Sequence, residues 1–327
     1  MKILVTGSAG HLGEAIIRTL RSSAHDPVGL DLHPSPFTDI VGSIVDREFV
    51  ARAVAQVDAI MHTATLHKPH VATHSRQDFV DTNISGTLNL LEEAVAAGVS
   101  RFVFTSTTSA FGAALVPVAG APAAWITEDV TPVPRNIYGV KKTAVEDLCR
   151  LFYRTHGLPC IVLRTARFFP EPDDSPAIRD TYEDENAKAN EFLFRRVDIE
   201  DAVQAHICAV ACAPDIGFAR YIISATTPFG PQDLAQLRTD APHVVGARCP
   251  AYQDVYEKRG WQMFPSLDRV YVNEKARHEL DWSPTFDFVH VIKQLAAGGP
   301  IGSDLARAVG AKGYHQGAFE NGLYPVA

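Results

Sequence analysis

The sequence predicts an α/β fold with a doubly wound parallel sheet, and three observations support that class. Short apolar runs rich in β-branched residues alternate with amphipathic helical patterns along the first two-thirds of the chain, as a sheet covered by helices on both faces requires. A glycine-rich turn joins the first run to the first helical pattern. The 327 residues also suffice for a large core and a second, smaller region.

The first expected unit is a strand over residues 2–6, a turn G-S-A-G-H-L-G over residues 7–13 and an amphipathic helix over residues 14–20. Three glycines let the backbone turn tightly and approach a pyrophosphate, although the spacing is G-x-x-G-x-x-G rather than G-x-G-x-x-G. The helix N-terminus adds N–H donors and a positive dipole end. The residues expected to hold a dinucleotide are Gly7, Gly10, His11, Leu12 and Gly13.

A second strand is expected over residues 28–32, and it contains Asp31. This carboxylate lies a little under twenty residues after Gly13, where it can accept hydrogen bonds from an adenosine ribose. Its charge would repel a 2′-phosphate, and no Arg or Lys follows it directly. The sequence therefore favours NAD over NADP.

The alternation of strand and helix continues to about residue 225. Further strands are expected over residues 58–62, 101–105, 160–164 and 220–224. Further helices are expected over residues 78–97, 138–156 and 198–212. A proline-rich acidic stretch over residues 170–176 interrupts the pattern, and after Thr226 prolines divide the chain into short irregular segments. No motif was found in residues 298–327.

Tyr138 and Lys142 lie four residues apart in one of these helices and therefore share a face. The ammonium of Lys142 can favour the ionised form of Tyr138. A free tyrosine has a pKa of about 10, whereas a general acid/base needs a pKa near the working pH. This pair, downstream of a glycine-rich phosphate loop, indicates an enzyme that transfers a hydride.

Five motifs in the same order resemble those of the extended short-chain dehydrogenase/reductase family, of the NAD-dependent epimerase/dehydratase type. They are T-G-x-x-G-x-x-G at residues 6–13, H-x-A at residues 62–64, N-x-x-G-T at residues 83–87, the strand and loop over residues 102–112, and the Tyr/Lys pair. The resemblance covers roughly the first two-thirds of the chain. It implies a Rossmann-type fold with NAD as cofactor and a smaller C-terminal substrate-binding region.

The resemblance also implies roles for individual residues. Thr107 would orient the substrate oxygen, Tyr138 would exchange the hydroxyl proton, and Lys142 would lower the Tyr138 pKa and hold the nicotinamide ribose. The further cofactor-binding residues that it implies are Ser43, Ile44, His62, Ala64 and Asn83. Ser43 replaces the usual Asp of the adenine segment, and Asn83 is expected to be a structural and proton-relay group.

Departures from the family pattern narrow the expected reaction. Thr108 and Ser109 stand where related dehydratases carry an Asp-Glu pair, so oxidation, reduction or epimerisation is favoured over dehydration and decarboxylation. Arg167 stands near the family's diphosphate-binding Asn, and either makes a charge-assisted contact there or indicates an anionic substrate such as a sugar acid. Pro69 interrupts any helix through the histidines at 67, 70 and 74, and no Cys or carboxylate cluster accompanies them, so a metal site is not expected. His67 and His70 are candidates for substrate contact or for a second acid/base. The candidate substrate residues are His67, Thr108 and Arg167.

Residues 1–167, completed by 197–225, are predicted to form the NAD-binding domain, and residues 168–196 and 226–327 the substrate-binding region. The predicted function is NAD-dependent hydride transfer at a secondary alcohol of a sugar or nucleotide-sugar-like substrate, by an epimerase or a dehydrogenase. The alternatives are a non-catalytic NAD(H)-binding regulatory protein and a carbonyl reductase acting on a non-sugar substrate.

Composition excludes other classes of function. The net charge of −8 argues against nucleic acid and anionic membrane as partners. No apolar run approaches about eighteen residues, and no signal peptide is recognised, so a cytoplasmic protein is expected.

The five dispersed cysteines are expected to be buried thiols. Helices like those over residues 78–97 and 138–156 pair in dimers of the family, so a homodimer is expected.

Overall fold

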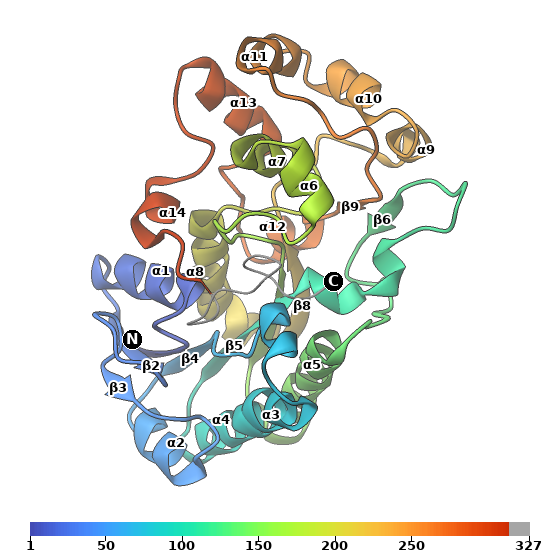
Figure 1. The fold of residues 1–327 in the computed structure, drawn as a ribbon. Coiled ribbons are helices and arrows are strands. Elements are labelled where there is room, and N and C mark those ends of the chain that lie inside the picture. Colours follow the sequence, from blue (N-terminus) through green and yellow to red (C-terminus); the bar gives the residue numbers. More distant parts are fainter. Residues whose placement is uncertain (314–327) are drawn as a thin grey trace.

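A computed structural model describes residues 1–313 and contains the predicted parallel sheet (Figure 1). Its strands are hydrogen-bonded in the order β3-β2-β1-β4-β5-β7-β8. They are β1 (Lys2–Thr6), β2 (Asp26–Asp31), β3 (Ile40–Val41), β4 (Ala59–His62), β5 (Arg101–Thr107), β7 (Cys160–Thr165) and β8 (Phe218–Ile223). All six predicted strands are confirmed to within two residues at either end, and β3 is the strand of this sheet that the sequence did not indicate.

Helices cover both faces of the sheet (Figure 1). The helices on one face are α1 (His11–Arg21) and α8 (Ile199–Ile216), and those on the other are α2 (Arg47–Val54), α4 (Gly86–Ala96) and α5 (Ile137–His156). In β1, Ile3 and Val5 join the core on the α1 and α8 side, whereas Leu4 joins the opposite core. The strands read as continuous apolar runs because both of their faces are buried.

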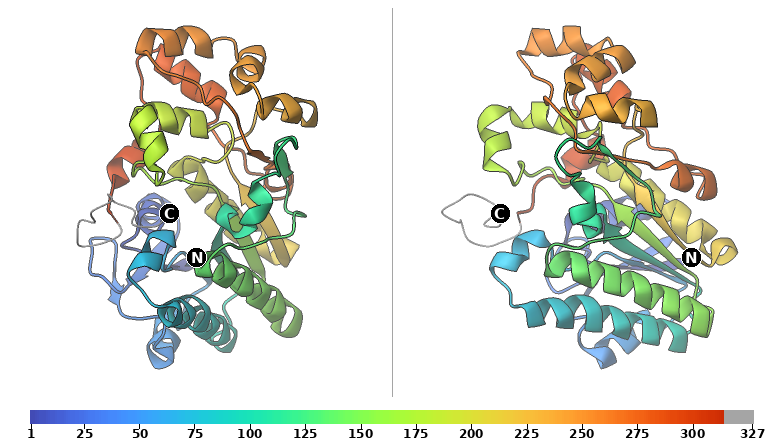
Figure 2. Two further views of the ribbon diagram at one scale, coloured as in Figure 1. Left: turned by 45° about the vertical axis from the view of Figure 1, so that its right-hand side comes forward. Right: turned by 90° about the vertical axis from the view of Figure 1, so that its right-hand side faces the viewer.

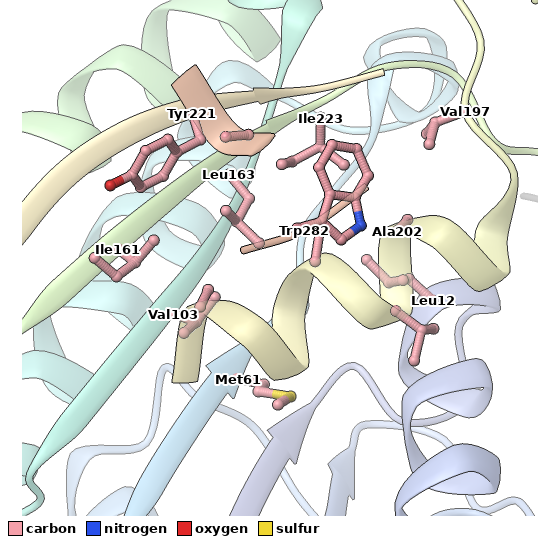
Figure 3. Packing of buried hydrophobic residues seen from close by; sticks show 14 of the residues in the cluster. Leu12, Met61, Val103, Ile161, Leu163, Val197, Ala202, Tyr221, Ile223 and Trp282 are labelled. Atoms are coloured by element: carbon pink, nitrogen blue, oxygen red, sulfur yellow. The ribbon is translucent and has the colours of Figure 1, made fainter. Parts of the chain in front are cut away.

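Figure 3 shows the core between the sheet and α8, where Met61, Val103 and Leu163 project from neighbouring strands. Trp282 closes this core from a later part of the chain, and its indole N–H donates to the carbonyl oxygen of Asp201 at 2.9 Å. The C-terminal region therefore packs directly against the parallel sheet.

The helix predicted over residues 78–97 contains a break. The chain forms α3 (Arg76–Val80), a π-helical turn at Asp81–Ser85, and then α4. Such π-turns occur mostly as single turns inside helices and are frequent at functional sites. This one contains Asn83, so the irregular turn coincides with the predicted N-x-x-G-T motif.

The region after residue 226 is more helical than the sequence indicated. Its helices are α9 (Leu234–Leu237), α10 (Ala241–Arg248), α11 (Tyr252–Arg259), α12 (Glu274–Glu279), α13 (Phe288–Ala296) and α14 (Asp304–Val309). Figure 2 shows most of these helices at one end of the molecule, whereas α12 and α14 lie against the parallel sheet and its helices. Pro242 lies in the first turn of α10, and the Asp240 side chain caps that helix. A proline in this region can therefore begin a helix rather than interrupt one.

The substrate region predicted over residues 168–196 and 226–327 has a core of its own, although residues beyond 313 lie outside the described part of the chain. This second cluster includes side chains of α10, α11, α13 and α7 (Asp184–Glu191), which follows α6 (Pro176–Thr181). The strand β6 (Ala124–Ile126) pairs in parallel with β9 (Arg269–Tyr271). A segment within the range predicted for the NAD-binding domain thus contributes to the second region.

Residues 168–196 leave the sheet after β7 and return beside the point of departure. The Arg167 N–H donates to the Arg195 carbonyl at 2.9 Å, and the Val197 N–H donates to the Arg167 carbonyl at 3.0 Å. After this pair of hydrogen bonds, α8 leads to β8, which lies next to β7. Among the described residues, no helix is both long and apolar enough to cross a membrane.

Candidate active site

A cleft of about 730 Å³ opens at the carboxyl ends of β1, β2, β4, β5 and β7. This is where open α/β sheets bind their ligands. The predicted site residues that line it are Gly7, Gly10, His11, Leu12, Gly13, Asp31, Ser43, Ile44, Ala64, His67, Thr107, Thr108, Tyr138, Lys142 and Arg167. His62 and Asn83 are not among its lining residues.

The glycine loop is packed so closely that side chains do not fit. Gly7 has a φ of +78°, and a Cβ on Gly13 would lie 2.0 Å from the Gly7 carbonyl oxygen. Gly10 precedes α1 and offers no side-chain cap, so the first N–H groups of the helix have no acceptor within it. The cradle therefore fits an anion such as a pyrophosphate.

Asp31 lies at the end of β2 beside this loop. Its carboxylate accepts hydrogen bonds from the N–H groups of Ala9, at 3.0 Å, and His33, at 2.9 Å. These two bonds fix the carboxylate in the cleft, where its remaining lone pairs can accept from ribose hydroxyls. Ser43 and Ile44 line the same end of the cleft after β3.

The predicted catalytic residues come together where β5 ends and α5 begins. The Asn136 side chain caps α5 by accepting from the Gly139 N–H at 3.0 Å. Tyr138, in the first turn, is buried and its hydroxyl shares a hydrogen bond with Thr107. Lys142 follows one turn later, and its ammonium donates to the Thr105 carbonyl oxygen at 2.6 Å.

The electrostatics of this group differ from the expectation that Lys142 lowers the Tyr138 pKa. Burial raises the pKa of Tyr138 to about 12, although the hydrogen bond with Thr107 opposes the rise. Burial also lowers the pKa of Lys142 to about 7, against the attraction of Glu146. Desolvation disfavours both charged forms, so the protein alone holds Tyr138 as a neutral phenol.

No sequence motif indicated a function for Lys141, which the structure places beside Tyr138. Its side chain is fully buried, and its ammonium lies 4.7 Å from the centre of the Tyr138 ring. It donates to the Thr65 hydroxyl at 2.7 Å and to the Leu66 carbonyl oxygen. Lys141 thus ties α5 to the loop after β4, a contact between residues 75 positions apart.

His62 and Asn83 do not line the cleft, but their hydrogen bonds hold the strands and loops next to it. The two ring nitrogens of His62 lie 2.7 Å and 2.9 Å from the hydroxyls of Thr6 and Thr87. Burial lowers the His62 pKa to about 3, so the ring is neutral. The Asn83 side-chain oxygen accepts from the Leu66 N–H at 2.8 Å. Both residues hold strands and loops in place, and their predicted cofactor contacts remain predictions.

His67 and Thr108 line the cleft near the catalytic group. The His67 ring centre lies 6.2 Å from that of Tyr138, and burial lowers its pKa well below the usual value. The Thr108 hydroxyl lies 3.5 Å from the Thr165 carbonyl oxygen. Both positions are consistent with substrate contact. Within residues 1–313, no group of three or more His, Cys, Asp and Glu side chains is placed to hold a metal ion.

The Arg167 side chain lines the cleft, but its guanidinium is hydrogen-bonded to other groups of the protein. Its guanidinium donates to the carbonyl oxygens of Glu171 and Pro172 at 3.0 and 2.9 Å. Its Nε lies 3.7 Å from the buried carboxylate of Glu191. Burial would raise the Glu191 pKa, but Arg195 and its neighbouring arginines hold it well below the usual range. This network fixes the 170–176 stretch at the edge of the cleft.

The cofactor loop also meets residues that the sequence did not connect with it. Nε2 of His11 lies 2.7 Å from the Glu171 carboxylate, and the Lys312 N–H donates to the same carboxylate at 3.1 Å. Arg269 and Tyr271 of β9 also line the cleft. The five cysteines are free thiols, of which Cys208 and Cys212 are only half-buried.

The family model described as "NAD dependent epimerase/dehydratase family" matches residues 3–214. Among curated proteins, the low-salt glycan biosynthesis protein Agl12 of Haloferax volcanii is 31% identical over 185 residues, which are 52% of this chain and 57% of that protein. A UDP-glucose 4-epimerase of Azospirillum brasilense is 30% identical over 174 residues, 50% of this chain and 48% of the enzyme. A 3-beta-hydroxysteroid dehydrogenase of Mycolicibacterium neoaurum is 37% identical over 118 residues, 33% of this chain and 32% of the enzyme. The chain spans about half the length of the curated relatives it matches, or less.

Solved structures resemble the whole chain. A short-chain dehydrogenase/reductase superfamily protein of Agrobacterium tumefaciens, with bound NAD, has a TM-score of 0.66 at 22% identity, covering 94% of this chain and 97% of that one. The UDP-N-acetylglucosamine 4-epimerase of Bacillus cereus has a TM-score of 0.62 at 20% identity, covering 91% and 98%. At these identities the likeness shows the fold.

Proposed function

Because the chain belongs to the NAD-dependent epimerase/dehydratase family, we propose that it transfers a hydride between NAD and a secondary alcohol of a sugar or nucleotide-sugar-like substrate. It acts either as an epimerase or as a dehydrogenase. The observation that carries the proposal is Tyr138 hydrogen-bonded with Thr107, with Lys142 one helical turn later, inside the cleft that the glycine loop borders. Motif order and geometry support the same assignment.

The residues that would hold NAD are those around the glycine cradle. The first-turn N–H groups of α1 would bind the pyrophosphate, and Asp31 would accept hydrogen bonds from the adenosine ribose. The Asp31 charge favours NAD over NADP, since it would repel a 2′-phosphate. NAD held in this way would supply the chemistry of hydride transfer to and from the substrate carbon.

In this proposal, side chains of the protein transfer the proton and orient the substrate. In the reducing direction, the neutral phenol of Tyr138 donates its proton to the substrate oxygen. In the oxidising direction, the phenolate takes the proton from the alcohol, and the charged form of Lys142 favours that phenolate. Thr107 holds the same substrate oxygen by a hydrogen bond. His67 and Thr108 complete the wall of the substrate site in this proposal.

A non-sugar alcohol or ketone is a second candidate substrate class, which would make the protein a carbonyl reductase or a similar dehydrogenase. It is favoured by the aromatic wall of Phe168 and Phe169 in the cleft and by the relative named a 3-beta-hydroxysteroid dehydrogenase. The regulatory alternative has no such support, because Thr107, Tyr138 and Lys142 are all present. A regulator that only senses NAD(H) needs none of them.

The domain roles and a homodimer are part of the proposal. Residues 1–167 with 197–225 hold the cofactor, and residues 168–196 with those after 226 shape the substrate site. The helix α5 exposes Val140 to 48% and Leu151 to 50%. These apolar side chains support pairing of α5 with a second copy of the chain.

The test begins with the protein as purified. It is denatured, and any released dinucleotide is identified by mass and absorbance. The intact protein is then scanned with sugars, uronic acids, nucleotide sugars and steroid alcohols for NADH formation. Tightly held NAD without net NADH indicates an epimerase, whereas an empty protein that reduces added NAD with one alcohol is a dehydrogenase.

The Tyr138→Phe substitution then tests the catalytic assignment. Turnover should fall by about 10²- to 10⁴-fold, the usual contribution of a positioned acid/base, whereas NAD affinity should stay near that of the wild type. Tyr153→Phe is the matched control, because Tyr153 lies on the exposed face of the same helix and its substitution should leave turnover unchanged. Normal turnover by the Tyr138→Phe variant contradicts the assignment.

A further inference from the structure

The lysine and arginine side chains of the cleft are, with one exception, already hydrogen-bonded within the described part of the chain. Lys68 donates to the Asp174 carboxylate at 2.7 Å, and Arg195 donates to the Glu191 carboxylate at 2.6 Å. Arg167 is held by main-chain carbonyl oxygens. The other members of the set that are hydrogen-bonded in this way are Lys142 and Lys312.

Arg269 is the exception. It projects from β9 into the lining of the cleft, and among residues 1–313 its guanidinium donates no hydrogen bond. Its nearest carboxylate is that of Asp268, at 3.9 Å, and Asp268 is instead bonded by Arg238 at 2.6 Å. The Arg269 side chain is only 14% exposed, and its Nε is buried without a partner.

Two aromatic rings keep this guanidinium in place. Its central carbon lies 5.5 Å from the centre of the Phe194 ring and 5.9 Å from that of Tyr271. A guanidinium over ring faces is attracted to them without using its N–H groups. Arg269 is therefore oriented, largely shielded from water, and left with donors for a ligand.

We propose that Arg269 anchors a single carboxylate of the substrate, so that the alcohol acted on belongs to a sugar acid. This inference rests on the proposed function and narrows its substrate class. A guanidinium can bind a carboxylate through two parallel hydrogen bonds. That contact fixes the far end of a short substrate while its alcohol lies near Tyr138 and Thr107.

The charges already present in the cleft favour a ligand with one negative charge over a ligand with two. The diphosphate of a nucleotide sugar carries two charges, but Arg167, Arg195 and Lys68 already pair with the carboxylates of Glu191, Asp173 and Asp174. A second negative charge near Asp174 would be repelled rather than bound. One uncompensated guanidinium therefore matches one carboxylate.

Binding to the NAD-loaded protein, measured by calorimetry, tests the inference without requiring turnover. The probes are D-glucuronate, D-galacturonate, D-gluconate, neutral D-glucose, inorganic phosphate and UDP-glucose. At least one sugar acid should bind saturably and more tightly than D-glucose. Arg269→Gln should weaken that binding by about 10- to 100-fold, the range expected for hydrogen bonds to a charged group.

Two further variants separate a specific contact from a general loss of charge or of fold. Arg269→Lys keeps the charge but not the paired donors, so it should bind the sugar acid with intermediate affinity. Arg248→Gln removes an exposed arginine that is paired with Asp233 and does not line the cleft, so it should bind like the wild type. All three variants should retain wild-type affinity for NAD, which shows that the sheet and cofactor loop are intact.

The inference is overturned if no sugar acid binds saturably, or if Arg269→Gln binds the best sugar acid as tightly as the wild type. It is also overturned if UDP-glucose or phosphate binds more tightly than every sugar acid and that binding depends on Arg269, since the anchored group is then a phosphate. Failure of the proposed hydride transfer has a different signature, namely normal turnover by Tyr138→Phe. The two failures are therefore distinguishable.

Discussion

Glu146 holds two arginines of the sheet to α5, and neutralising it should destabilise the fold. Its carboxylate lies 2.7 Å from the Arg164 guanidinium and 2.9 Å from that of Arg220. It also accepts a hydrogen bond from the Ser106 hydroxyl at 2.6 Å. Glu146→Gln preserves the shape of the side chain but removes the charge that compensates the arginines.

The expected loss of folding stability depends on which arginine loses the negative charge that compensates it. The Arg164 side chain is 3% exposed, so it cannot turn to solvent, and breaking such a buried pair costs about 3–5 kcal/mol. Arg220 is 22% exposed and already pairs with Asp147 at 2.9 Å, so it adds little. Against a total stability of about 5–15 kcal/mol, the expected loss of 3–5 kcal/mol is large.

Urea unfolding followed by far-UV circular dichroism measures this loss. With a slope of about 3 kcal/mol per molar urea, the midpoint should fall by about 1–2 M. Asp147→Asn is the control, because Asp147 is 60% exposed and its surface pairs should contribute less than about 1 kcal/mol. Adding Arg164→Met to Glu146→Gln should restore part of the loss. A Glu146→Gln midpoint within the range of the Asp147→Asn control would refute the reasoning.

Two other predictions concern the cofactor and the proton. Alcohol oxidation should accelerate from pH 5 to pH 7, because burial raises the Tyr138 pKa to about 12 and the phenolate is the form that accepts the proton. The rate should level off above pH 7, where Lys142, whose pKa burial lowers to about 7, loses the charge that favours the phenolate. Initial rates that decline from pH 5 to pH 7, with the enzyme still folded, would contradict this prediction. Gly13→Ala should weaken NADH binding at least about 10-fold in a fluorescence titration, because its Cβ would lie 2.0 Å from the Gly7 carbonyl oxygen and displace the loop; unchanged affinity would show that the loop is not the cofactor cradle.

The parallel sheet could be predicted from the sequence because its strands are buried on both faces. Runs such as Ile3-Leu4-Val5 then leave a continuous apolar signal. The strand β3 has two residues and leaves no such signal. The β6–β9 pairing joins positions more than 140 residues apart, and each strand is too short to stand out. Prolines after Thr226 were expected to divide the chain into irregular segments, but Pro242 follows the Asp240 cap and lies in the first turn of a helix.

In the candidate site, local motifs predicted which residues lie together in the cleft. They did not predict the hydrogen bonds and the burial that position each side chain. Tyr138 and Lys142 share a helix, so their proximity follows from spacing alone. The partners of Lys141 lie in the loop after β4, and Arg167 binds carbonyl groups of a turn that only the folded chain forms. The raised Tyr138 pKa depends on burial. None of these is encoded in a short sequence window.

The paired hydrogen bonds at Arg167 allow residues 168–196 to change in length during evolution while the sheet beside them keeps its structure. They close residues 168–196 into a loop whose two ends meet beside the sheet. Lengthening a closed loop costs little entropy, so insertions or deletions there can reshape the substrate wall while β7 and β8 keep their register. The loops after β1 and β2 stay untouched by such changes. One sheet and glycine loop can in this way be inherited by descendants whose clefts differ in shape.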